Sequence, residues 1–193
     1  MTTVRRTGDT IELSLSDGDA AMLPLLAEQV AALLDADSTT GSRDPLEAMV
    51  GFADAPVAAP DDPALQRLLP DAYSAGDQPG DGDDTTEMSE EFRRLMDGEL
   101  RRIKAEALRA LQSDLAALGR DAGGSLMLRA DRAEIWLQAL NDIRLVVASR
   151  LDVTEDMTEV VRNLAPDDPR IPLFVAYERL TWLQESLVAA VDG

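Results

Sequence analysis

Two clusters of basic residues are the groups in this chain whose type and spacing best suit a binding function. The pair Arg93-Arg94 and the trio Arg101, Arg102 and Lys104 lie seven to eleven residues apart, so part of each cluster falls on one face of a helix. Cationic side chains gathered on one face bind phosphate groups or an acidic protein partner. The alternative is a solvated face on which these cations pair with acidic neighbours in the same helix, which are Glu90, Glu91, Glu99 and Glu106.

Trp182 is the other residue that the sequence offers as a contact to a partner. Together with Val175 it falls on the side of the C-terminal apolar segment opposite the main apolar stripe. Either a second layer of the fold covers these side chains, or they form an exposed apolar spot that binds a protein partner or a second copy of the chain.

The residue types that most enzymes use are missing from this chain. It has no cysteine and no histidine, which excludes disulfides, thiol nucleophiles, Ser-His-Asp triads and histidine zinc sites. Paired carboxylates remain, but the acidic residues show no core-facing pattern. The most acidic stretch lacks the alternation of a calcium-binding loop; its aspartates are Asp77, Asp81, Asp83 and Asp84. We therefore expect a non-enzymatic protein with no metal and no cofactor, and a carboxylate-based enzyme is the less favoured alternative.

The net charge of −19 restricts the partners of the protein. A strongly negative chain repels nucleic acid and anionic lipid, so nucleic acid is a possible but disfavoured partner and a protein partner is expected. No apolar run approaches the roughly 18 residues of a membrane span, and the opening MTTVRR lacks the apolar segment of a signal peptide. These features predict a cytoplasmic protein that does not enter the membrane.

The segment 131–151 predicts a central helix around which the other elements pack. Asp131 is placed to cap its N-terminus and Glu134 to complete a capping box. The segment has no interior Gly or Pro, and its apolar residues lie on more than one side, which is typical of a helix buried on several sides. Its main stripe consists of Trp136, Ala139, Leu140, Ile143, Val146, Val147 and Leu151.

Three polar residues in this central helix require a structural explanation. Asn141 and Asp142 are expected to be hydrogen-bonded fold-formers or solvated groups, as is usual for polar residues near a core. The same interpretation holds for Arg144, but because Arg144 borders the apolar stripe, the alternative for it is a partly buried ion pair with an acidic residue of another helix.

Local signals predict the remaining elements. A β-hairpin spans about 3–15 with a turn at Gly8-Asp9, and 125–129 alternates as a possible third strand. Further helices are expected at 17–35, 89–118 and 172–191, and shorter ones after Asp44 and Asp62 and near 154–164. Ser16 and Asp19 are expected to cap the helix at 17–35, in which Pro24 should produce a kink or a later start. In the helix at 89–118, Gly98 should cause an interruption, and Asp97 should cap the restart. Gln184 lies in the buried face of the helix at 172–191.

The predicted fold class is therefore mainly α. It is a multi-helix bundle around the helix near 131–151, with a small N-terminal β-hairpin and a possible third strand near 125–129. Residues 1–193 are predicted to form a single domain, and 74–86 a flexible acidic loop within it, because that stretch consists almost entirely of loop-forming and acidic residues.

Several segments of the chain resemble the actinobacterial domain-of-unknown-function 2017 family. They are RRTGDTIELSL (5–15), DPLEAMVG, RLLPDAY, EFRRLMDGELR, WLQALNDIRLVVASRLDVTED (136–156) and YERLTWLQESLV (177–188). The resemblance covers nearly the whole chain, and its motifs are core and capping residues that bring no catalytic residue with them. It implies a mainly helical cytoplasmic protein linked to transcription under oxidative stress, acting through DNA and RNA polymerase sigma-factor contacts. A thiol-switch version of that role departs from this sequence, so regulation would need a partner or a ligand.

Composition and resemblance together favour a non-enzymatic regulatory or interaction protein, associated with transcription through RNA polymerase, a sigma factor or DNA. The alternative is a homo-oligomeric scaffold or adaptor in which Trp182 lies at a contact. The contact residues predicted for a partner are Arg93, Arg94, Arg101, Arg102, Lys104 and Trp182.

Overall fold

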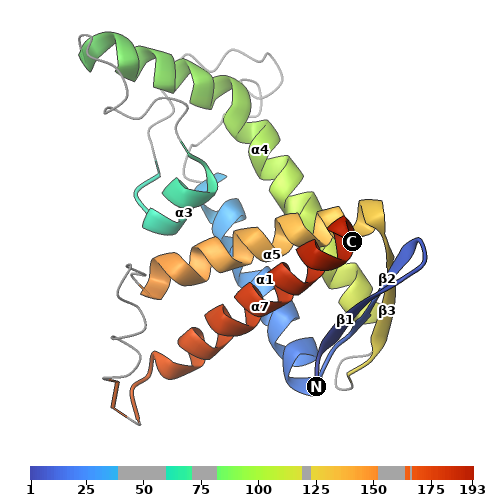
Figure 1. Ribbon diagram of the computed structural model, residues 1–193. Coiled ribbons are helices and arrows are strands. Elements are labelled where there is room, and N and C mark those ends of the chain that lie inside the picture. The colour runs from blue at the N-terminus through green and yellow to red at the C-terminus, as the bar shows by residue number, and fades with distance from the viewer. Residues whose placement is uncertain (39–59, 71–81, 119–122, 152–163, 166) are drawn as a thin grey trace.

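The computed structural model describes residues 1–38, 60–70, 82–118, 123–151, 164–165 and 167–193, of which 82–95 are described by their helical backbone alone. The elements follow in the order β1 (Thr3–Thr7), β2 (Thr10–Ser14), α1 (Asp17–Ser38), α3 (Pro63–Leu68), α4 (Gly82–Leu118), β3 (Ser125–Arg129), α5 (Ala130–Leu151) and α7 (Ile171–Asp192). They form a mainly helical body with a small sheet at one end, as predicted (Figure 1). No helix in these described ranges is long and apolar enough to cross a membrane. The assignment of 1–193 to one domain stays a prediction.

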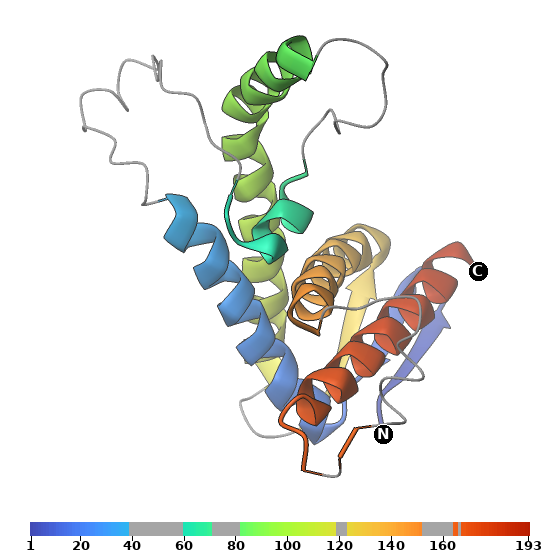
Figure 2. The same cartoon turned by 90° about the vertical axis from the view of Figure 1, so that its left-hand side faces the viewer.

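Helix α5 is the centre of the core. It packs against α7, α4, α3 and α1, and Figure 2 shows it end-on between α4 and α7. Trp136, Leu140 and Ile143 are completely buried, and each such side chain contributes roughly 1.5–3 kcal/mol. The prediction of a central helix is therefore confirmed. The predicted N-cap is wrong by a short shift: α5 begins at Ala130, so Asp131 lies in its first turn, where a carboxylate still interacts favourably with the helix dipole.

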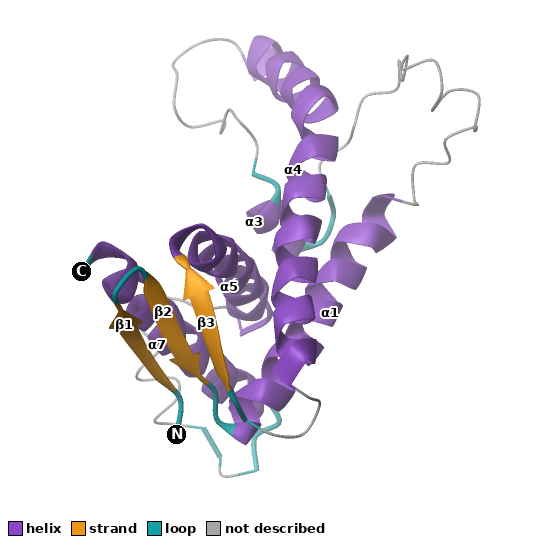
Figure 3. Cartoon of the chain, turned by 90° about the vertical axis from the view of Figure 1, so that its right-hand side faces the viewer, coloured by secondary structure: helices purple, strands orange, loops and turns teal. Residues whose placement is uncertain are grey.

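The three strands form one antiparallel sheet in the order β1-β2-β3 (Figure 3). The hairpin turns at Gly8, whose φ of 61° is a conformation that glycine adopts without strain. Ile11 of β2 pairs with Leu128 of β3, and both are buried with Leu13 against the helices. The third strand near 125–129 is thus confirmed, and it fixes the start of α5 because the chain passes from β3 into that helix directly.

Helix α1 begins where the sequence predicted. The Ser16 hydroxyl accepts from the Asp19 N–H at 3.3 Å and donates to the Asp19 carboxylate at 2.8 Å. The Ser16 N–H is satisfied by the hydroxyl of Thr2 at 2.9 Å, so the residue that precedes β1 supplies part of the cap. The later start expected from Pro24 does not occur, because Pro24 lies well inside a helix that runs from Asp17 to Ser38.

Helix α4 differs from its prediction in two ways. It continues through Gly98 without a break, so Asp97 caps no restart. It also begins at Gly82, inside the range 74–86 that the sequence predicted as loop; residues 74–81 lie outside the described residues. The C-terminal part of α4 packs against α1, α5 and β3, whereas its N-terminal part extends beyond the body (Figure 3).

A polar network joins α4 to α5 beside the core. Arg132 donates to both carboxylate oxygens of Asp114, at 2.7 and 2.8 Å, and to the Ala110 carbonyl at 2.9 Å. The indole N–H of Trp136 donates to Asp114 at 2.8 Å. Burial raises the pKa of Asp114, but these hydrogen bonds outweigh burial and hold that pKa below its usual value. The largest aromatic residue of the core is therefore oriented by a carboxylate from another helix.

Of the short helices expected from sequence, the one after Asp62 is present. The Asp62 carboxylate accepts from the Ala64 N–H at 2.8 Å and Pro63 occupies the first turn of α3. The same carboxylate accepts from Arg150 of α5 at 2.6 Å, which fastens α3 to the central helix. The helices expected after Asp44 and near 154–164 lie outside the described residues, apart from the last residue of the second range.

Candidate interaction surfaces

Arg101 is engaged within the fold rather than displayed to a partner. Its side chain is 14 % exposed and pairs with Asp97 at 2.6 Å, one helical turn earlier in α4. It also donates to the backbone carbonyl of Leu34 near the end of α1, at 2.9 Å. Arg101 therefore joins two helices, which is a structural role.

Arg102 is half-exposed and lies between two glutamates of α4. It pairs with Glu99 and with Glu106, each at 2.6 Å. These contacts raise the Arg102 pKa further above its normal value and lower that of Glu99. Exposed pairs of this kind contribute little to stability, but they neutralise the guanidinium. This is the solvated, internally paired face that the sequence offered as the alternative to a phosphate-binding face.

Lys104, the only lysine of the chain, donates to the carboxylate of Asp142 at 2.7 Å. Asp142 is 3 % exposed, and its burial raises its pKa even though Lys104 acts in the opposite direction. This pair joins α4 to α5, and it is an ion pair of the kind that the sequence offered as an alternative for Arg144. Arg144 itself makes no ion pair with another described residue; it meets only Asn141, at 3.5 Å, and its Nε is buried without a hydrogen-bond partner.

The first basic pair, Arg93 and Arg94, belongs to the part of α4 described by its backbone alone. Their proposed role stays a prediction. The described trio does not form one free cationic face, because each of its members is paired with an acid. The sequence could not show this, since the partner of Lys104 comes from a different helix.

Trp182 is exposed, which agrees with the second of the two interpretations of the sequence, an exposed apolar spot, and not with a covering layer. The side chain is 37 % exposed and Val175, two turns earlier on α7, is 54 % exposed. The guanidinium of Arg179 lies 5.3 Å from the centre of the Trp182 ring, a cation–π distance. Arg179 is in turn held by the carboxylate of Asp19, to which Nε donates at 3.1 Å and a terminal nitrogen also donates. Trp182 is thus an exposed aromatic ring with the guanidinium of Arg179 on one side, and Asp19 holds that guanidinium in place.

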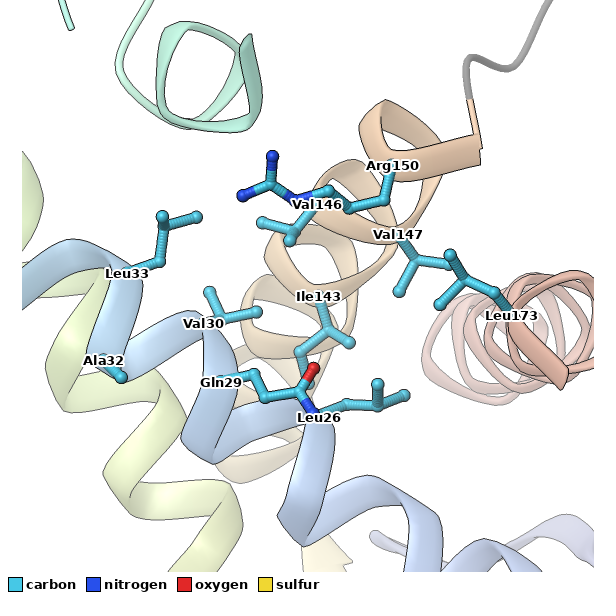
Figure 4. A pocket seen from close by; sticks show the side chains of 10 residues that line it. All are labelled: Leu26, Gln29, Val30, Ala32, Leu33, Ile143, Val146, Val147, Arg150 and Leu173. Carbon is cyan, nitrogen blue, oxygen red and sulfur yellow. The ribbon is translucent and has the colours of Figure 1, made fainter. Parts of the chain in front are cut away.

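A shallow apolar pocket of about 320 Å³ lies between α1 and α5, near the start of α7 (Figure 4). Val30, Ile143 and Val147 form its walls, and its polar groups are the amide of Gln29 and the guanidinium of Arg150. Arg150 is already bound to Asp62 at 2.6 Å, so this cation is not free to anchor a ligand. Within the described ranges, no group of three or more acidic residues is arranged to hold a metal ion.

The family model described as "Domain of unknown function (DUF2017)" matches residues 1–191. The chain belongs to the DUF2017 family. The expectation drawn from the sequence segments is therefore confirmed across nearly the entire length. The DUF2017 chain matches no solved structure.

Curated relatives of this DUF2017 protein carry a regulatory name. The chain is 33 % identical over 192 residues to the oxidative stress regulator AosR of Mycobacterium tuberculosis and of Mycobacterium bovis, covering 97 % of this chain and 85 % of the relative. It is 30 % identical over 177 residues to a putative oxidative stress regulator AosR of Mycobacterium leprae, covering 90 % and 78 %. These names point to a regulatory role and give no indication of catalysis.

Sequence reasoning missed two functional or structural groups of this DUF2017 protein. Asp19 was recognised as a capping residue, but not as the residue that holds Arg179 under Trp182. Asp114 was not singled out at all, although it binds both Arg132 and Trp136. The only local signal for Asp114 is an acid on the border of an apolar helical stripe, and many solvated acids share that position.

Proposed function

We propose that this DUF2017 protein is a non-enzymatic regulator that acts in an oxidative-stress response by binding a protein partner. The similarity to proteins named oxidative stress regulator AosR, over almost the full chain, carries the proposal. The geometry supports it, because the chain presents an exposed tryptophan that is supported within the fold by Arg179.

The partner is proposed to belong to the transcription machinery, either RNA polymerase or one of its sigma factors. Direct DNA binding is the less favoured version, since the net charge is −19 and each member of the described basic trio is paired with an acid. A protein contact requires no net positive charge and uses apolar and aromatic anchors instead.

Complementation in an actinobacterial host tests the regulatory role. A strain lacking its own DUF2017 gene would receive either this chain or a Trp182→Ser variant, and survival after peroxide exposure would be compared. We expect the unaltered chain to restore survival and the variant to restore less, at equal protein level. Full restoration by the variant contradicts a role for Trp182, and no restoration by either chain contradicts the regulatory proposal.

Two binding measurements separate the versions of the proposal. Size-exclusion chromatography with purified RNA polymerase holoenzyme should show co-elution, and free sigma factors should be tested alongside. Fluorescence anisotropy with labelled DNA at two salt concentrations should show no binding at either. DNA binding at low salt would restore the DNA version, and an oligomer of this chain alone by light scattering would favour the scaffold alternative.

A further inference from the structure

The outer side of α7 carries two parallel columns of exposed residues. Both columns repeat every seven residues, and together they alternate at spacings of three and four, the pattern by which one helix contacts another. All six residues are exposed. We call them the α7 seam: an apolar column of Val175, Trp182 and Ala189, and an acidic column of Glu178, Glu185 and Asp192.

This seam faces away from the body. The opposite side of α7 buries Leu180, Leu183 and Leu187, which pack toward α5 and the sheet. In Figure 1, α7 lies in front of α1 and beside α5, with no described helix in front of it. In the part of the chain that the structure describes, none of the three acids of the seam forms an ion pair. Within the described ranges the seam is therefore open to a partner, and at its C-terminal end Arg6 of β1 donates to the backbone carbonyls of Ala190 and Val191.

Trp182 is the anchor of the seam and is fixed before any partner binds. Its ring lies against Arg179, and Arg179 is fastened to the buried carboxylate of Asp19 on α1. An aromatic side chain that is already ordered loses little conformational freedom on binding. Tryptophan is one of the residue types enriched among those that dominate the affinity of protein interfaces.

Charge decides which occupant fits the seam. A second copy of this chain in a parallel pair would place Glu178 and Glu185 against the same glutamates, and an antiparallel copy would place them against Val175 and Trp182. Both arrangements are unfavourable, since they bring like charges together or bury carboxylates against apolar groups. A partner helix with an apolar column and a basic column satisfies both halves of the seam at once.

We propose that the α7 seam binds a basic amphipathic helix of a partner protein. Apolar residues of that helix contact the column of Val175, Trp182 and Ala189, while its lysines or arginines pair with the acidic column. The inference rests on the proposed function, because it assigns a binding surface to a regulator that acts through a protein partner.

The test uses the full chain and two synthetic helical peptides of 21 residues. One peptide has leucine in one column of the heptad repeat and lysine in the adjacent column, and the other has glutamate in place of lysine. Binding is followed by anisotropy of the labelled peptide and by emission from Trp182, since Trp136 is completely buried and gives a constant background. We expect the lysine peptide to bind at least tenfold more tightly than the glutamate peptide, with an affinity that falls as salt is added.

Charge-reversed variants establish whether the seam is responsible. The double variant E178K/E185K should invert the preference, so that the glutamate peptide binds at least tenfold more tightly. The matched control, E28K/E134K, changes the net charge by the same amount at exposed acids on α1 and α5 and should leave the preference unaltered. If both double variants behave alike, the attraction is a property of the overall charge, and the seam proposal is overturned.

Two further results would also overturn it. Equal binding of the two peptides by the unaltered chain would show that the seam does not select basic partners. A stable dimer that E178K/E185K strengthens would show that the occupant is a second copy. Failure of the seam is distinguishable from failure of the proposed function, because stress complementation and co-elution with polymerase are measured with the unaltered chain and do not depend on the peptides.

Discussion

Arg179 on α7 donates two hydrogen bonds to the carboxylate of Asp19 at the start of α1, although the two residues are 160 positions apart in the chain. The hydroxyls of Thr2 and Ser16 donate to the same carboxylate. One buried acid therefore ties the residue before β1, the first helix and the last helix together. It also supports Trp182 through Arg179.

Replacing Asp19 with asparagine should lower the free energy of unfolding at neutral pH by about 1–3 kcal/mol, because the bonds to a charged group are lost. Burial raises the pKa of Asp19, but the bonds from Arg179, Thr2 and Ser16 outweigh it, so this pKa lies below its usual 3.8. Because the Asp19 pKa is lower in the folded state than in the unfolded state, its contribution to stability is fully present above pH 3.8. This contribution is lost as the pH falls through the folded-state pKa. Urea unfolding at pH 7, 5 and 3 should therefore show that the free energies of unfolding of Asp19→Asn and the unaltered chain differ less at pH 3 than at pH 7. The control Asp9→Asn, at the exposed hairpin turn, should show no such narrowing.

Replacing Lys104 with methionine should destabilise the protein by about 3–5 kcal/mol at neutral pH, because Asp142 is left as a buried, unpaired charge. Burial already raises the Asp142 pKa, so protonation relieves this cost as the pH falls toward 3.8, and the difference from the unaltered chain should shrink. The double variant K104M/D142L should recover most of the loss. Arg109→Met, at an exposed position of the same helix, should change stability by less than about 0.5 kcal/mol. An equal loss of stability in Lys104→Met and Arg109→Met would contradict the pairing of Lys104 with Asp142.

Gly98→Ala should raise the free energy of unfolding by about 0.5–1 kcal/mol, as alanine is the better helix former and a Cβ at this position meets nothing within 4 Å. Thermal unfolding followed by circular dichroism measures the change. Gly8→Ala provides the contrast, because the φ of 61° at that turn strains any residue with a Cβ and should lower stability by about 1 kcal/mol. A destabilising Gly98→Ala would mean that α4 requires a flexible point there.

Gln184→Met should stabilise the protein by about 1 kcal/mol. The side-chain carbonyl oxygen of Gln184 is buried without a hydrogen-bond partner, so the native state carries an uncompensated desolvation cost that methionine removes. Chemical denaturation of the two proteins gives the difference. Gln138→Met, at an exposed position of α5, should stay within about 0.5 kcal/mol of the unaltered chain.

Most elements of this fold could be predicted because their signals are local. The apolar periodicity of 131–151 and the alternation of 125–129 depend only on neighbouring residues, and both elements were found where they were expected. The cap at Ser16 is likewise encoded within four residues. Gly98 misled the prediction because one glycine costs a helix only about 1 kcal/mol relative to alanine, and in the next turn Arg101 pairs with Asp97 and binds the Leu34 carbonyl of α1.

The interaction surfaces were predictable only in part. Periodicity placed Trp182 on the outer side of the last helix, and the structure agrees. Which cation meets which acid could not be inferred, because Lys104 and Asp142 are 38 residues apart and their approach depends on how α4 crosses α5. For the same reason the sequence offered Arg144 as a candidate for a buried ion pair, whereas Arg144 forms no ion pair with an acid among the described residues. Gln184 was expected to find partners across the core, yet its oxygen has none.

A chain with a single lysine offers a lysine-specific protease only one peptide bond, the one that follows Lys104. That bond lies within α4, where the lysine side chain is held by Asp142, so the protease can cut only when this part of the helix opens. When reclosing is faster than cleavage, the digestion rate of the native protein reports the equilibrium population of that open form. A simple gel assay would then follow the local opening of α4 directly, including any protection that a bound partner confers.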